Sequence, residues 1–444
     1  MNIEHRALNI EKVLNAQCST INVQRMTSPA NNITQLVDHL FRHESGKMIS
    51  VLSRLLGLQN IETAQDIVHD TLLQAMNTWG FKSIPDNPSA WLYRVAKNKA
   101  IDFLRREKKF REISPQYSYL LQSEYTLSST VNNLFLDNEV EDSQLRMMFA
   151  CCHPAIAEES QIALTLKTLC GLSVNEIARA FLTTDETIAK RIYRAKEKIK
   201  SEKIELDVPQ SNELSLRTDT VLKSLYLLFN EGYNSSNPDK LIREDLCEEA
   251  IRLCFLITQH PLTTFPRSKA LLGLMCFQAS RLDARLDDNN NIILLKHQDR
   301  SKWNRALMSK GFELMEESTE PFEVSSYHLE AAIAAQHATA MSFEQTDWKS
   351  IYHLYEMLYQ LQPNPVVAMN KAIASAYAIS KQNALTELQQ IKGLEHHHLY
   401  YATVGEIYFD LENKTEAKKF YQKALALTSS TYEQQLLSNK INNC

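Results

Sequence analysis

The sequence predicts an all-α protein built from several helical domains. Only 9 Gly and 12 Pro occur in 444 residues, a composition that favours helices with short connections. Two Ser/Thr-x-x-Glu patterns lie ten residues apart and mark the starts of neighbouring helices. A stretch near the C-terminus repeats itself with a period of 33 residues, as helical repeat arrays do. A chain of this length is long enough for about three domains.

Composition and charge narrow the class of protein. Hydrophobic residues make up 44% and charged residues 23% of the chain, which argues against wholesale disorder. No apolar run of about 18 residues occurs, and the first 20 residues lack the apolar segment of a signal peptide, so we expect no membrane association and a cytoplasmic location. The first 25 residues form either a flexible tail or, if translation starts at Met26, no part of the protein.

The cysteines do not predict a metal site. None of the 8 cysteines belongs to a Cys-x-x-Cys pair, so reduced and mostly buried thiols are expected. Cys151, Cys152 and His153 are consecutive, but neighbouring residues of a helix point about 100° apart and no second ligand pair is visible. We predict no metal and no cofactor. Glycine-rich phosphate loops, nucleophile elbows and His-Glu-x-x-His patterns are also missing from the sequence, which predicts no catalytic residue.

Residues 87–106 predict a helix with one apolar face and one polar face. Pro88 suits the first helical position, and Asn87 is a good cap before it. An apolar set and a polar set fall on different sides of this helix. The apolar set is Leu92, Val95, Ala96 and Phe103, and the polar set is Trp91, Arg94, Asn98, Asp102 and Arg105. The polar set can hold unstacked bases and phosphates, although taken alone it equally fits a solvated basic face.

Residues 173–200 predict a helix-turn-helix. Capping boxes at Ser173–Glu176 and Thr183–Glu186 leave room for one short helix, a tight turn and a longer helix. The inner faces are formed by Ile177, Ala178 and Phe181 on the first helix and by Ile188, Ile192, Ala195 and Ile199 on the second. The opposite face of the second helix gathers Glu186, Thr187, Lys190 and Arg194, with Arg191 and Lys198 at its margins. Such a surface can read base edges in the major groove and bind phosphates, whereas a structural helix pair is the simpler alternative.

Two basic islands stand out in a chain of net charge −5. Residues 82–111 contain nine Lys or Arg against three Asp or Glu, and residues 187–203 contain seven against two. The islands coincide with the two helices described above. They indicate two separate contacts with a polyanion.

The order of these segments resembles the extracytoplasmic-function (ECF) group of bacterial RNA polymerase sigma factors of the sigma-70 superfamily. Upstream of the basic helix, Asp66, His69 and Asp70 match the family's Asp-x-x-Gln-Glu pattern, with His and Asp in place of Gln and Glu. Residues 81–87 occupy the position of the loop that captures a flipped base of the minus-ten element, and AWLYRVAKNKAIDFLRR looks like the promoter-melting segment. In the second motif, Ala189 stands where Lys is usual and Leu182 where Gly is common.

The resemblance implies a sigma-two bundle and a sigma-four helix-turn-helix domain. The expected domains are an N-terminal tail (1–32), the sigma-two domain (33–110), a linker (111–135), the sigma-four domain (136–205), a helical middle domain (206–325) and TPR-like repeats (326–444). The implied partners are the bacterial RNA polymerase core and promoter DNA, both as duplex and as single strand. By this resemblance the core-binding residues are Asp66, His69 and Asp70. Those for the minus-ten element are Asn87, Trp91, Arg94, Lys97, Asn98, Arg105 and Arg106. Those for the minus-thirty-five element are Glu186, Thr187, Lys190, Arg191, Arg194 and Lys198.

The C-terminal half adds a repeat to this arrangement. The repeat within residues 327–428 aligns Thr339 with Ala372 and Gly405, and the later positions follow in step. These later triplets are Ile351, Ala384 and Ala417; Tyr355, Leu388 and Tyr421; and Leu358, Ile391 and Ala424. The spacing fits the tetratricopeptide (TPR) pattern, whose concave surface suits a protein or peptide partner. Before it, Gln298, Asp299, Arg300 and Trp303 either hold a ligand or fix helix packing through Arg–Asp pairing and a buried indole.

Two functions remain open on the sequence. In the first, the chain is a promoter-specificity subunit whose C-terminal extension controls its activity. In the second, it is a helix-turn-helix regulator of duplex DNA with a TPR-like sensor, and is not a polymerase subunit. The basic helix at 87–106 favours the first, because a duplex regulator needs no second basic and aromatic helix upstream of its recognition helix.

Overall fold

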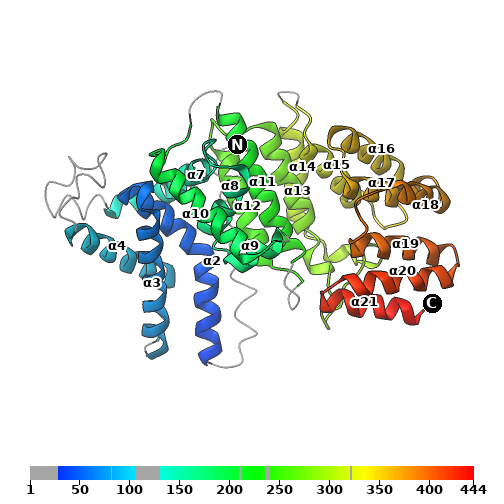
Figure 1. The fold of residues 1–444 in the computed structure, drawn as a ribbon, viewed down its shortest axis with the longest axis horizontal. Helices are drawn as coiled ribbons and strands as arrows, with labels where there is room; N and C mark the ends of the chain where they lie inside the picture. Colours follow the sequence, from blue (N-terminus) through cyan, green and yellow to red (C-terminus); the bar gives the residue numbers. More distant parts are fainter. Residues whose placement is uncertain are drawn as a thin grey trace. The chain divides into compact units, whose positions relative to one another are not determined.

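The structure, a computed structural model, describes residues 29–81, 83–106, 131–181, 183–209, 213–235, 241–320 and 323–444. Every regular element in these residues is a helix, apart from one isolated antiparallel bridge between Leu286 and Ile292 (Figure 1). The prediction of an all-α protein is confirmed. Most of the predicted N-terminal tail and the first part of the predicted linker lie outside the described residues.

The chain divides into two compact units. Unit 1 comprises Met1–Leu228 and Glu248–Ile257, and unit 2 comprises Phe229–Cys247 and Thr258–Cys444. Two helices, α11 (Glu213–Tyr233) and α12 (Glu244–Gln259), run across the boundary. No helix in the described residues is long and apolar enough to cross a membrane.

Unit 1 holds both basic islands. Its other helices are α2 (Pro29–Leu56), α3 (Ile61–Phe81), α4 (Pro88–Arg106), α7 (Asp137–Cys151), α8 (Glu158–Thr168), α9 (Val174–Ala180) and α10 (Asp185–Ser201), with a short 3-10 turn η1 (Leu58–Asn60). Helix α2 packs against both α3 and α7. Helices α7 and α8 are buried around most of their circumference, including the polar side chains of Gln144 and Gln161. A helix buried on all sides forms the centre of a domain, and here α8 takes that place.

Helix α4 begins where the sequence predicts. Pro88 is its first residue, and the Asn87 side-chain oxygen accepts a hydrogen bond from the backbone N–H of Ala90 at 2.9 Å. The buried stripe follows every fourth residue and consists of Leu92, Ala96, Ala100 and Leu104. Val95 and Phe103, which were expected on the core side, are half-buried and flank this stripe. The core-facing side of α4 is therefore rotated slightly from the predicted one.

The helix-turn-helix forms with one corrected cap. At the start of α9, the Ser173 hydroxyl accepts from the Glu176 N–H at 3.1 Å and Glu176 accepts from the Ser173 N–H at 2.7 Å, so this capping box is confirmed. The second predicted box, from Thr183, is wrong by one residue. Thr184 is the cap of α10 and accepts from the Thr187 N–H, while the Glu186 side chain turns outward to Lys190. The four predicted inner residues of α10 (Ile188, Ile192, Ala195 and Ile199) are all buried.

Unit 2 consists of helices that pair with their neighbours in sequence. They are α13 (Pro266–Ala279), α14 (Arg305–Glu317), α15 (Ser326–Thr339), α16 (Trp348–Leu361), α17 (Pro365–Ala378), α18 (Lys381–Gln390), α19 (His398–Asp410), α20 (Lys414–Leu427) and α21 (Thr431–Asn442), with 3-10 turns η3 (Leu282–Ala284), η4 (Leu295–His297) and η5 (Arg300–Lys302). Each helix from α15 to α20 packs against the one that follows it. This confirms a helical C-terminal region of paired helices.

The 33-residue alignment marks where these pairs cross. Gly405 of α19 lies so close to Tyr421 of α20 that a Cβ atom at Gly405 would approach the ring to 2.8 Å. Ala372, which aligns with Gly405, is fully buried, and so are Ala384 and Ala417 of the next aligned position. The first copy departs, because Thr339 is exposed at the end of α15. Small residues at the crossings therefore set the spacing of the last two pairs.

The segment around Trp303 serves packing. The Trp303 ring is buried, and the guanidinium groups of Arg281 and Arg300 lie over it at 5.2 and 4.8 Å. Arg300 donates to the Ala340 carbonyl at 2.8 Å, whereas Asp299 caps its own 3-10 turn through Ser301. The buried indole is as predicted, but the predicted Arg–Asp pairing is wrong, because backbone carbonyls take the arginine.

Candidate nucleic-acid and polymerase interface

The outer face of α10 presents most of the predicted duplex-reading residues to solvent. Glu186, Lys190, Arg194 and Lys198 are exposed, while Thr187 and Arg191 are half-buried. Each of the two exposed lysines forms an ion pair with a glutamate four residues away. Lys190 lies 2.6 Å from Glu186, and Lys198 lies 2.8 Å from Glu202. Arg191 forms an ion pair with Glu159 of α8. Of the predicted cations, Arg194 is thus the exposed one for which the described residues show no ion pair.

Tyr193 belongs to the same outer face and was missed in the sequence. Its side chain is 64% exposed, the most exposed aromatic ring among the large hydrophobic side chains in the described part of unit 1. Tyrosine counts as a hydrophobic residue, so in a helix rich in isoleucine the sequence suggests a core position for it. The available signal was its position: it is one residue beyond buried Ile192 and three beyond exposed Lys190, off the apolar stripe.

The outer face of α4 carries the second predicted surface. Arg94, Asn98, Arg105 and Arg106 are exposed, as is Asn87 in the preceding loop. Arg105 lies 3.6 Å from Asp102 in an exposed pair one turn apart, which is worth little in water. This face combines guanidinium and amide donors, which suit phosphates and base edges.

Trp91 and Lys97 lie on the sides of α4 that contact the protein. The Trp91 ring meets the buried Trp79 ring of α3 edge-on at 5.3 Å. The Lys97 ammonium lies 3.3 Å from the Asn132 side-chain oxygen and over the Phe135 ring. Burial, followed by the nearby charge of Arg94, lowers the pKa of Lys97. Both side chains are half-buried, so a role in base contact stays a prediction for them.

Helix α3 presents the predicted polymerase-binding residues together. Asp66, His69 and Asp70 are exposed on one side of α3, one turn apart. Asp70 lies 3.9 Å from Lys99 of α4, and the His69 ring meets the Phe41 ring edge-on at 6.3 Å. An exposed acidic strip of this kind can meet a basic surface of a partner protein.

Helices α3 and α2 are joined to α10 and α7 by ion pairs. Glu62, one turn before Asp66 on α3, lies 3.1 Å from Lys200 and 3.6 Å from Lys196 of α10. The hydrogen bond from Lys200 holds the pKa of Glu62 below its ordinary value, although burial acts to raise it. A second set of ion pairs joins α2 to α7, where Arg54 of α2 lies 2.8 Å from Glu139 and 3.0 Å from Asp142.

Gly46 of α2 lies very close to the end of α8. A Cβ atom there would lie 2.1 Å from the Leu169 carbonyl oxygen at the end of α8, so only glycine fits. Nearby, Arg42 of α2 lies 3.2 Å from Glu176 of α9. Together with the contacts of Glu62 and Arg54, this closes α2 and α3 onto α7–α10.

Cys151, Cys152 and His153 lie at the end of α7. Both thiols are buried, and burial raises the pKa of each, to about 12 for Cys152. The Cys152 sulfur lies 3.8 Å from the Thr165 hydroxyl, and His153 Nδ1 accepts from the Ala155 N–H. No three His, Cys, Asp or Glu side chains in the described parts of the chain group as metal ligands would.

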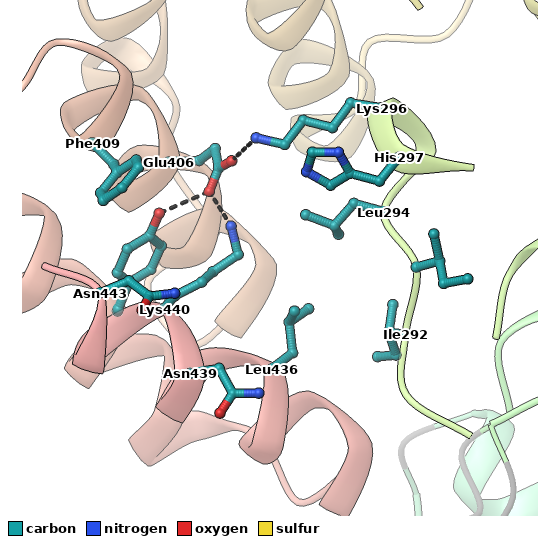
Figure 2. A pocket seen from close by; sticks show the side chains of 12 residues that line it. Ile292, Leu294, Lys296, His297, Glu406, Phe409, Leu436, Asn439, Lys440 and Asn443 are labelled. Carbon is teal, nitrogen blue, oxygen red and sulfur yellow. Dashed lines mark hydrogen bonds and ion pairs between the residues drawn. The ribbon is translucent and has the colours of Figure 1, made fainter. Parts of the chain in front are cut away.

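Unit 2 contains a cavity of about 420 Å³ beside a half-buried cluster of charged side chains (Figure 2). Glu406 of α19 accepts from the Tyr421 hydroxyl at 2.7 Å and from Lys296 at 2.5 Å, and it also pairs with Lys440 of α21. Burial raises the pKa of Glu406, but the charge of Lys440 and the hydrogen bonds of both lysines and Tyr421 outweigh it and hold the pKa at about 2. Ile292, Leu294 and Leu436 add an apolar side to the cavity.

Three family models match the chain. Residues 40–110 match Sigma-70 region 2, residues 146–199 match Sigma-70 region 4, and residues 217–319 match a family of unknown function, DUF6596. An uncharacterized protein of Rhizobium meliloti (strain 1021) is 33% identical over 381 residues, which are 84% of this chain and 88% of that protein. No solved structure matches.

Characterised relatives match the N-terminal part. The ECF RNA polymerase sigma factor SigW of Bacillus subtilis is 24% identical over 165 residues, 35% of this chain and 82% of SigW. The ECF RNA polymerase sigma-E factor of Haemophilus influenzae is 28% identical over 165 residues, 35% of this chain and 80% of that protein. The chain is an ECF sigma factor of the sigma-70 family. The resemblance inferred from the motifs is thus confirmed.

The matched regions assign the helices of this sigma factor. Region 2 takes in most of α2 together with α3 and α4, and region 4 runs from within α7 to near the end of α10. DUF6596 begins within α11 and ends just after α14. Such domains belong to a non-enzymatic family and imply binding to the polymerase core and to promoter DNA. The alternative, a duplex regulator outside the polymerase, leaves the region 2 match over residues 40–110 without a purpose.

Proposed function

We propose that this sigma factor binds core RNA polymerase through α3, reads the minus-thirty-five element through α10, and melts the minus-ten element through α4. Its chemistry is non-covalent: cations and amides hold phosphates and base edges, and the polymerase makes the bonds. The observation that carries this proposal is that both matched regions expose most of their predicted polar residues, as Asp66, Asn98 and Arg194 exemplify.

The C-terminal extension is proposed to regulate this activity. It forms an array of paired helices that is TPR-like in the spacing of its small residues, and such arrays bind peptides or helices on a concave side. Because the array is part of the same chain as the two promoter-binding regions, a protein or peptide that binds the array would influence those regions. The cavity beside Glu406 offers the partner an apolar recess next to lysine side chains.

Reconstitution tests the core of the proposal. Purified full-length chain would be mixed with bacterial core polymerase and a library of genomic fragments, and the 5′ ends of the transcripts would be sequenced. We expect co-purification with core and transcripts that start at a shared sequence, which core alone does not produce. Transcripts identical to those of core alone would refute the assignment.

A charge variant tests the polymerase contact. Asp66→Lys combined with Asp70→Lys should abolish co-purification with core, because it reverses the exposed acidic strip of α3. Glu316→Lys makes the same kind of change at an exposed site of α14 and serves as the control. If both variants bind core alike, α3 does not form the contact.

A further inference from the structure

Helix α12 of the C-terminal extension places a partly buried ion pair among the sigma helices of unit 1. Glu249 is 3% exposed and accepts two hydrogen bonds from Arg252, at 2.7 and 2.8 Å. A bidentate arginine–carboxylate pair of this kind is strong and geometrically specific. Removing Arg252 would leave the buried Glu249 carboxylate without this partner, which is costly.

This ion pair contacts α7, the helix that leads into region 4, and lies near α2 of region 2. The other guanidinium nitrogen of Arg252 donates to the buried Gln144 side chain of α7 at 3.1 Å. Glu249 lies 4.0 Å from His43 of α2. Glu44 of α2 and Tyr93 of α4, which share a 2.6 Å hydrogen bond, act electrostatically on Arg252 as well. Residues more than 100 positions apart in the sequence thus meet at α12.

The arrangement that α12 supports is too compact to read a whole promoter. On the proposed function, α4 and α10 read elements about 25 base pairs apart, a distance of about 85 Å at 3.4 Å per base pair. Both helices are tied to α3, which has 21 residues and is therefore only about 32 Å long. Helix α4 packs along α3, and α10 is joined to it through Glu62. Reading both elements at once requires α3 and α10 to separate.

We propose that Glu249 and Arg252 form a latch through which the extension holds region 2 and region 4 in a closed arrangement that must open before both promoter elements are bound. The latch joins α2 to α7 across the closed interface. The Glu62–Lys200 pair lies at another part of the same interface and reports whether it is closed. Promoter reading rests on the proposed function, whereas closure by the latch can be measured on the free chain.

Zero-length carbodiimide cross-linking of the full-length protein tests the latch. Glu62 and Lys200 are close enough to be joined directly, and the cross-linked peptide is quantified by mass spectrometry, with Glu62→Gln to verify its assignment. We expect the cross-link in the free chain and a loss of about fivefold or more in the complex with core and promoter DNA, the range of an ordinary coupling between sites. An undiminished cross-link in an initiating promoter complex would overturn the need for opening.

Two variants test the role of α12. Gln144→Ala removes the α7 side of the latch and leaves the Glu249–Arg252 pair intact, and Arg252→Gln removes the pair itself. Both should lower the Glu62–Lys200 cross-link in the free chain and raise initiation at limiting sigma factor, while Arg252→Lys should restore part of the cross-link. Arg267→Gln breaks an arginine–glutamate pair inside unit 2 and is the matched control.

The outcomes separate the latch from the proposed function. An unchanged cross-link in folded Gln144→Ala protein, verified by circular dichroism, would overturn the latch even if Arg252→Gln fails to fold. If the chain initiates at no promoter, the proposed function fails. The response of the cross-link to Gln144→Ala in the free chain then still decides whether α12 holds the two regions together.

Discussion

At the scale of single residues, the cations of α10 are not equivalent. Arg191 is half-buried and paired with Glu159, whereas Arg194 is exposed. A guanidinium group already held by a carboxylate gains less from a phosphate, because it must give up that partner first. The sequence placed both arginines near one face, but it could not show that α8 supplies an acidic partner to one of them.

Arg194→Gln should therefore flatten the salt dependence of promoter binding more than Arg191→Gln does. Each DNA phosphate that the protein no longer neutralises removes about 0.9 from the slope of log affinity against log salt. Fluorescence anisotropy of holoenzyme on duplex promoter DNA at several salt concentrations measures this slope. Equal slopes for the two variants would show that the Glu159 pair opens on binding or that neither arginine meets a phosphate.

Glu406 is a second residue whose surroundings decide its role. Its pKa of about 2 in the folded protein lies below the ordinary value of 4.5, so the ionised form stabilises the fold. This stabilisation, about 3 kcal/mol at most, is fully present above pH 4.5 and is lost as the pH falls through 2. Removing the charge leaves Lys296 and Lys440 facing each other without a carboxylate.

Glu406→Gln should lower the free energy of unfolding of unit 2 by about 2 kcal/mol at neutral pH, and the difference from the unmodified protein should shrink as the pH falls from 4.5 towards 2. Urea unfolding followed by circular dichroism at a series of pH values measures both effects. Glu416→Gln, which breaks an exposed pair with Lys419 in the same unit, should cost less than about 0.5 kcal/mol. A pH-independent difference would contradict the assigned ion pair.

At the scale of elements, local sequence signals predict where a helix starts and which face it buries, but they do not predict which side chains meet between helices. The cap and proline of α4 and the apolar stripe of α10 depend on neighbours within a turn or two, so the sequence reveals them. The helical periodicity places Trp91 with Arg94 and Asn98 on the predicted base-binding face of α4, yet its ring meets Trp79. That contact depends on how α3 lies against α4, which no periodicity of α4 encodes.

The exposed face of α4 leads to a prediction about strand opening. Asn98→Ala and Arg105→Ala should spare binding to duplex DNA but reduce opening of the minus-ten region, because both side chains are exposed and suited to single-stranded bases and phosphates. Permanganate reactivity of thymines measures opening. Asn77→Ala, at an exposed site of α3, is the neutral control. Normal opening in both α4 variants would remove α4 from promoter melting.

At the scale of the whole molecule, the boundary between the two units was beyond sequence reasoning. The sigma-four domain was expected to end at residue 205, yet unit 1 continues through α11 to Leu228 and takes Glu248–Ile257 from α12. Contacts such as Arg252 with Gln144 join residues 108 positions apart and leave no local pattern. A family resemblance gives the bounds of the domains that family members share. In this chain the core of unit 1 also includes part of the C-terminal extension.

This boundary predicts that a chain ending at Leu206 is structurally incomplete. Such a chain lacks buried residues that belong to the core of unit 1, among them Val221, Leu225, Ile251 and Leu253. Each fully buried aliphatic side chain stabilises by about 1.5–3 kcal/mol, so their joint loss approaches the whole stability of a typical domain. A chain ending at Gln259 keeps both segments and should unfold cooperatively, whereas the shorter one should show a broad, lowered thermal transition in circular dichroism.

The comparison between the two truncations separates folding from regulation. If the chain ending at Leu206 is inactive in transcription while the one ending at Gln259 is active, the shorter chain lost its fold rather than an activating signal. The longer chain also keeps Glu249 and Arg252, so any activity it gains over the full-length protein reports the contribution of unit 2 alone. Equal stability and cooperativity of the two truncated chains would contradict the assignment of α11 and α12 to the core of unit 1.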